Sequence, residues 1–155
     1  MILLKVVGAL LLSTLIHEGG HATYAMMQGA DVTRFSVIPS DGHFGYVEVE
    51  GLPKSSEPGF YLAGFGASTL SIPVSSAFIK KYPDEEFFRI WRAMAVLDFP
   101  AHVAMSYFQD DNDVNKFCKR SGISKGWVVA SAALYLMFSK DLILQDGKLL
   151  YRKYF

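Results

Sequence analysis

The sequence has very little cysteine. Cys118 is the single cysteine among 155 residues, so no disulfide can form within the chain. A zinc site built from several cysteines is excluded for the same reason. We expect Cys118 to be an inert packing residue.

The sequence also lacks an excess of charge. Its 15 Lys and Arg residues balance 15 Asp and Glu residues, and no basic block stands out. This balance gives no indication of a nucleic-acid partner. We also find no internal repeat and no low-complexity run, so we predict one domain covering residues 1–155.

Apolar residues are abundant, at 51% of the chain, and they are grouped into long segments. The first, from Ile2 to Met27, would form a helix of about 39 Å, long enough to span a bilayer. Met1 to Ile16 also fits a secretory signal peptide, but no small-x-small cleavage site follows, so we predict a retained membrane helix. Three later segments have near-spanning length: Phe60–Ile79, Phe87–Phe108 and Trp127–Leu144.

These segments predict an all-α, multi-pass integral membrane protein with about four transmembrane helices in the lipid bilayer. The second is rich in Gly, Ala and Ser, which favours close packing against the first helix, and Pro73 should kink it. Arg89, Arg92, Asp98 and His102 interrupt the third segment. A soluble helical domain is therefore the alternative fold.

A β-hairpin is expected between the first two helices. Residues 32–38 and 44–50 are rich in β-branched and aromatic residues, and Pro39-Ser40-Asp41-Gly42 between them is typical of a turn. We place this hairpin at the membrane surface, beside the end of the first helix. It either covers the site as a connection or offers a strand edge to an extended substrate.

The first apolar segment carries an H-E-x-x-H motif, His17-Glu18-Gly19-Gly20-His21. In a helix, His17 and His21 lie on one face, where two imidazoles can bind one zinc ion. Glu18 then lies on the adjacent face, within reach of a water molecule at the metal. The alternative is a pair of structural histidines beside a solvated carboxylate.

A catalytic zinc site usually has three protein ligands, so one ligand must come from elsewhere. An acidic cluster at residues 109–114 follows the third apolar segment. If consecutive helices alternate in direction, this cluster lies on the same side as His21. The alternative is a solvated helix cap and turn.

The H-E-x-x-H motif, the β-rich segment, the small-residue helix with Ala63-Gly64-Phe65-Gly66 and the late Asp together resemble the site-2 protease family of intramembrane zinc metalloproteases. The likeness is greatest to small members without a PDZ domain. It implies that Asp113, within Asn112-Asp113-Val114, is the third ligand, with Asp110 in reserve.

The chain departs from the family pattern at two places. Ser68 stands where many relatives have a substrate-binding Asn in the second helix. Leu97-Asp98-Phe99-Pro100 has a different order from the usual Asn-x-x-Pro-x-x-x-Leu-Asp-Gly signature. Asp98 and His102 are at helical spacing, and we consider four roles for them: orienting a zinc histidine, a proton path, an alternative Asp ligand, or a self-contained polar pair.

The sequence therefore predicts an intramembrane zinc metalloprotease with one Zn²⁺ per chain, held by His17, His21 and Asp113. Glu18 would be the general base and the proton donor to the leaving amine. The expected substrate is a locally unwound transmembrane helix of another protein. The alternatives are a non-catalytic metal-binding scaffold and a membrane metal transporter.

Overall fold

The computed structural model describes residues 2–39 and 44–154. These residues are mostly helical and contain one two-stranded sheet. The elements in chain order are α1 (Ile2–Met27), β1 (Asp31–Ser36), β2 (Tyr46–Glu50), the 3-10 helix η1 (Lys54–Ser56), α2 (Glu57–Lys81), α3 (Glu86–Met105), α4 (Asp113–Ser121) and α5 (Lys125–Tyr154).

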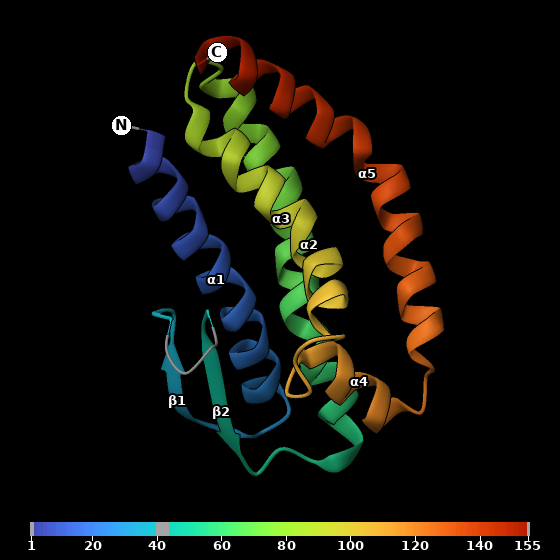
Figure 1. Ribbon diagram of the computed structural model, residues 1–155. Helices are drawn as coiled ribbons and strands as arrows, with labels where there is room; N and C mark the ends of the chain where they lie inside the picture. The colour runs from blue at the N-terminus through green and yellow to red at the C-terminus, as the bar shows by residue number, and fades with distance from the viewer. Residues whose placement is uncertain (1, 40–43, 155) are drawn as a thin grey trace.

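The long helices form an elongated bundle (Figure 1). Helices α1, α2 and α3 all pack on one another, and α5 packs on the outer side of α3. The hairpin and α4 lie on opposite sides of the bundle at its lower end in Figure 1, whereas α1 begins and α5 ends at the upper end. The bundle therefore has two distinct ends, and the hairpin marks one of them.

Small residues bring α1 and α2 into close contact. A Cβ atom on Gly20 of α1 would lie only 2.5 Å from the Ala63 carbonyl oxygen and 2.7 Å from the Ala67 Cβ in α2. Only a glycine fits such an approach, because any side chain would overlap the neighbouring backbone. The predicted packing of the small-residue helix against the first helix is confirmed.

The predicted hairpin is present. Strands β1 and β2 pair antiparallel, with Asp31 opposite Glu50. Gly29, at φ 79°, provides the left-handed backbone that turns the chain out of α1 into β1. The predicted turn at residues 39–42 falls largely on residues 40–43, which lie outside the described residues. The hairpin extends along α1, since a Cβ on Gly45 would touch the side chains of Thr14 and Glu18.

Three helical stretches of the described chain are long and apolar enough to cross a membrane. They are Ile2–Met27, Lys54–Lys81 and Lys125–Lys153. The first has the predicted bounds, and the other two extend beyond the predicted segments at both ends. Many apolar side chains on α5 are exposed, as expected for contact with lipid: Trp127, Leu134, Met137, Phe138, Leu144 and Leu149.

Helix α3 is not among these three stretches. It forms where we predicted a third span, but it carries Arg89, Arg92 and Asp98 within one apolar length. These charges face other helices, since Arg92 is buried and Asp98 meets α1. A fourth transmembrane span at α3 stays a prediction.

Helix α4 forms immediately after the acidic cluster. The Asn112 side chain caps it by accepting a hydrogen bond from the Val114 amide at 2.8 Å. Gly122, at φ 75°, ends it. Val114 and Phe117 are buried in a core with Phe65, which fixes α4 against the side of α2. Asp113 is thereby held at the first residue of a docked helix.

Candidate metal centre

His17 and His21 lie one turn apart on α1 and face the bundle interior. Their exposed fractions are 4% and 3%. Their Nε2 atoms are 3.1 Å apart. The one-face geometry predicted from the motif is therefore present, and it is directed toward α2 and α4.

Each imidazole has an acceptor at its other nitrogen. His17 Nδ1 is 2.8 Å from Asp98 Oδ2, and His21 Nδ1 is 2.6 Å from the Phe60 carbonyl oxygen. A hydrogen on each Nδ1 donates to these acceptors and leaves the Nε2 lone pair free. Both lone pairs then point into the same small space.

Asp113 completes this group. Its Oδ2 is 3.4 Å from His17 Nε2 and 3.2 Å from His21 Nε2. Burial by itself raises the pKa of the Asp113 carboxyl, but its hydrogen bonds to His17 and His21 outweigh burial and hold the pKa well below its usual range. Asp113 is therefore an anion at neutral pH.

The three atoms have the spacing of zinc ligands. In a tetrahedral zinc site with bonds of 2.0–2.1 Å, ligand atoms lie about 3.3 Å from one another. The observed separations of 3.1, 3.2 and 3.4 Å match this value. Two imidazoles and one carboxylate are also a common donor set for catalytic zinc. The residues present thus fit a zinc ion.

His102 offers a second possible ligand set. This set consists of His17, His102 and Asp113. Each offers one possible ligand atom, and the three atoms lie within 4.8 Å of one another. The His102 ring stacks on the His17 ring, with 4.9 Å between centroids. This second group shares two residues with the first but is wider. The set with His21 is therefore the better match to zinc.

Gly64 of α2 lies directly against the two imidazoles. A Cβ at this position would be 2.5 Å from His17 Nε2 and 2.6 Å from His21 Nε2. Glycine is therefore required where α2 closes over the candidate metal-binding atoms. The sequence places Gly64 in a small-residue helix, but it does not show that this glycine faces the histidines.

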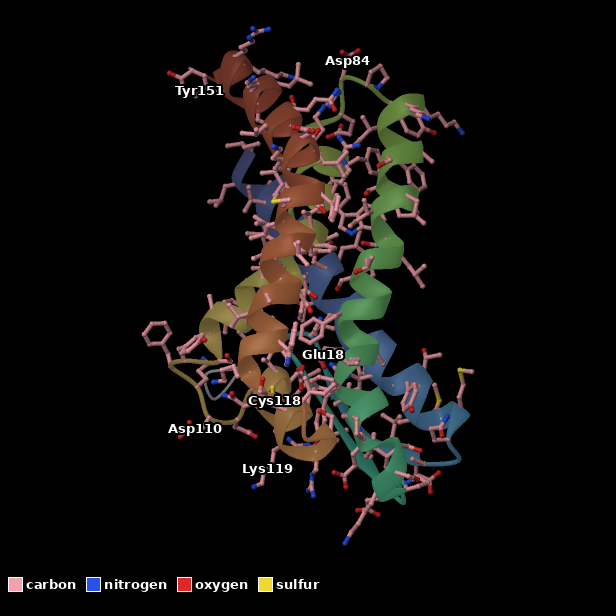
Figure 2. All side chains as sticks on the ribbon, turned by 90° about the vertical axis from the view of Figure 1, so that its right-hand side faces the viewer. Glu18, Asp84, Asp110, Cys118, Lys119 and Tyr151 are labelled. Atoms are coloured by element: carbon pink, nitrogen blue, oxygen red, sulfur yellow. The ribbon has the colours of Figure 1, made fainter. Side chains whose placement is uncertain are left out.

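Glu18 lines a cavity of about 550 Å³ beside the two histidines. In Figure 2 it lies between the helices, above α4. The cavity is bounded by α1, by β2 and by the apolar side chains of Met94, Leu97 and Ala101 on α3. A carboxylate thus faces a space large enough for several residues of an extended peptide.

The other candidate residues have different positions. Asp110 is exposed and lies at the periphery of the molecule, away from Glu18 (Figure 2). Asp98 contacts His17 on the side opposite Asp113, so it is a neighbour of the proposed ligands and not one of the three converging atoms.

Two features of the centre were missed by sequence reasoning. The Phe60 carbonyl that orients His21 is a backbone atom, and no side-chain pattern marks it. The docking of α4 was also missed, although Asn112 before Asp113 is a typical N-cap signal.

Comparison with known proteins adds no relative. No protein-family model matches the chain, and neither the curated proteins nor the solved structures contain a match.

Proposed function

We propose that this protein is an integral-membrane zinc peptidase, similar to the site-2 protease family, that cleaves a peptide bond in or near a transmembrane helix of another protein. The observation that carries the proposal is the convergence of His17 Nε2, His21 Nε2 and Asp113 Oδ2 at zinc-ligand spacing. Glu18, next to His17 in the sequence, faces the adjoining cavity.

Membrane placement rests on the three apolar helices and on exposed aromatic residues near both ends of the bundle. Trp127 and Tyr107 are exposed at the hairpin end, and Tyr82 and Tyr151 are exposed at the opposite end. Such aromatic residues are enriched at membrane–water interfaces. With α3 as the proposed fourth span, the centre lies inside the bundle near one interface.

The cavity supports an extended peptide substrate. Strand β2 lines it on one side, and apolar side chains of α1 and α3 line the other. A two-stranded sheet leaves backbone groups unpaired at the outer edge of each strand, and an unwound substrate can pair with such an edge. Unwinding is required because a helix hides its carbonyls in its own hydrogen bonds.

In the proposed reaction His17, His21 and Asp113 hold the metal. A bound zinc supplies Lewis acidity, which makes water more acidic and polarises the scissile carbonyl. The Glu18 carboxylate accepts the proton from the attacking water and then donates it to the leaving amine nitrogen. The walls formed by α1, α3 and β2 hold the substrate chain next to Glu18.

The test compares wild type with Glu18→Gln in detergent-purified protein. Glutamine keeps the shape of the side chain but cannot act as a base. We expect about one zinc per chain in both proteins by elemental analysis. Cleavage of reporter proteins that each carry one transmembrane helix should fall by about 10²–10⁴-fold in Glu18→Gln, the usual contribution of a general base.

Three results would contradict the proposal. Wild-type protein without zinc would remove the metal centre. Equal cleavage by wild type and Glu18→Gln would remove the role of Glu18. Zinc binding without cleavage across a broad set of reporters would favour the non-catalytic scaffold.

A further inference from the structure

Asp98 is a largely buried carboxylate that is not one of the three converging ligand residues. Its side chain is 17% exposed, and its ion pairs in the described part of the chain are with His17 and His102, not with Lys or Arg. Burying a carboxylate is costly unless it is hydrogen-bonded or paired. The position of Asp98 therefore calls for an explanation.

The contact with His17 gives a specific role. Asp98 Oδ2 is 2.8 Å from His17 Nδ1, on the opposite side of the ring from Asp113. A carboxylate at this nitrogen holds the hydrogen there, fixes the ring orientation and makes the other nitrogen a stronger ligand. His21 differs, because the partner of its Nδ1 among the described residues is the neutral Phe60 carbonyl.

Asp98 also has a polar neighbour on another helix. The Ser68 side chain of α2, which is 3% exposed, forms a polar contact with Asp98. The Asp98 Oδ1 atom faces His102 Nε2 at 3.8 Å, on the same helix. A chain of contacts thus runs from Ser68 on α2 through Asp98 on α3 to His17 on α1.

We propose that Asp98 is a positioning residue that fixes the tautomer and orientation of His17 for metal binding, and that Ser68 in turn fixes Asp98. This inference rests on the proposed metal centre. Asp98 would orient the ligand His17, whereas Asp113 would bind the metal itself.

The experiment measures zinc affinity and the visible absorption spectrum of the Co²⁺-substituted protein, both in detergent. The variants are Asp98→Asn, Asp98→Ala and Ser68→Ala. The control is Asp110→Asn, the same substitution at an exposed aspartate near the same end of the bundle. Thermal unfolding of each variant checks that the bundle is intact.

Loss of such a supporting partner typically lowers metal affinity by about 10–100-fold. We expect the loss of zinc affinity to be about 100-fold in Asp98→Ala. In Asp98→Asn the loss should be about 10-fold, because the amide oxygen can still accept the hydrogen on His17 Nδ1. Both should alter the Co²⁺ spectrum, Ser68→Ala should shift it in the same direction by less, and Asp110→Asn should match wild type.

The outcomes separate this inference from the proposed function. Wild-type affinity and spectrum in Asp98→Ala would overturn the positioning role while leaving the zinc centre intact. Complete loss of stoichiometric metal in Asp98→Asn, with the bundle folded, would make Asp98 a direct ligand and would also overturn it. A wild type that binds neither Zn²⁺ nor Co²⁺ would remove the centre itself.

Discussion

The two ends of the bundle bury charge in different ways. At the end where α5 finishes, marked by Asp84 and Tyr151 in Figure 2, the buried Arg92 forms two hydrogen bonds of 2.8 and 2.7 Å with Asp146. At the hairpin end, Asp98 and Asp113 are paired only with histidines in the described chain.

This difference separates a structural cluster from a candidate functional one. A buried charge is tolerated when the protein supplies its partner, as Asp146 does for Arg92. At the hairpin end the protein supplies two carboxylates and two imidazoles, with no Lys or Arg paired to Asp98 or Asp113 in the described chain, and this set can bind a cation. One divalent metal would balance both carboxylates. The four predictions below test this contrast, beginning with the largest expected effect.

The largest effect should come from removing a metal ligand. His21→Ala is expected to abolish stoichiometric zinc binding, because only His17 and Asp113 would remain. His102→Ala should keep about one zinc per chain, since its ring stacks on His17 outside the tight ligand group. Elemental analysis of both purified variants is the measurement. If His21→Ala retains zinc and His102→Ala loses it, the metal site is formed by His17, His102 and Asp113 instead.

Breaking the charge cluster at the other end should reduce stability without affecting the metal. Asp146→Asn leaves the buried Arg92 without its counter-charge, which typically costs about 3–5 kcal/mol. Thermal unfolding in detergent should show this loss, while zinc per folded chain stays at the wild-type value. Asp141→Asn, at an exposed position of the same helix, is the control. A loss of zinc in Asp146→Asn would show that the two ends are coupled.

Adding a methyl group at Gly64 should disturb the candidate metal centre without affecting the opposite end of the bundle. Gly64→Ala places a Cβ against both Nε2 atoms, whereas Gly66→Ala on the same helix meets nothing within 4 Å. A displacement of about 1 Å in a catalytic group can cost about 100-fold in rate. We expect that loss of peptidase rate, with weakened zinc binding, in Gly64→Ala only. Matching behaviour of the two variants would contradict the close approach of α2.

The smallest effect should be a pH dependence of the folding stability that arises from Glu86, at the end of the bundle opposite the hairpin. Glu86 contacts Lys153 and Lys5, and these two lysines lower its pKa from 4.5 to about 2. A depressed carboxyl pKa stabilises the fold above pH 4.5, and this contribution is lost as the pH falls from 4.5 toward 2. The effect is at most about 1 kcal/mol, because Lys153 is half exposed.

Thermal unfolding of wild type and Glu86→Gln between pH 7 and pH 3 measures it. Glu85 is also paired with Lys5, which lowers its pKa, so it titrates in the same window and remains in both proteins. The difference between the two curves therefore isolates Glu86. Curves that stay parallel throughout this range would show that Glu86 is not stabilised by its lysines.

Much of the local structure could be predicted from the sequence. The bounds of α1, the i, i+4 geometry of its histidines and the presence of the hairpin follow from short-range patterns. Each depends on backbone periodicity and turn-forming residues within a few positions. Helix α3 is harder to assign, because its charged residues are compatible both with a span that faces other helices and with a helix outside the membrane.

The sequence by itself determined which donors exist: two imidazoles at helical spacing, a neighbouring Glu18, no useful cysteine and several late aspartates. The tertiary structure decided which of them meet. His17 and Asp113 are 96 positions apart, and their contact depends on how α4 docks against α2. The orientation of His21 by the Phe60 carbonyl, and the approach of Gly64, likewise depend on packing between helices. Periodicity fixes a residue's face on its own helix, but only packing determines what that face meets.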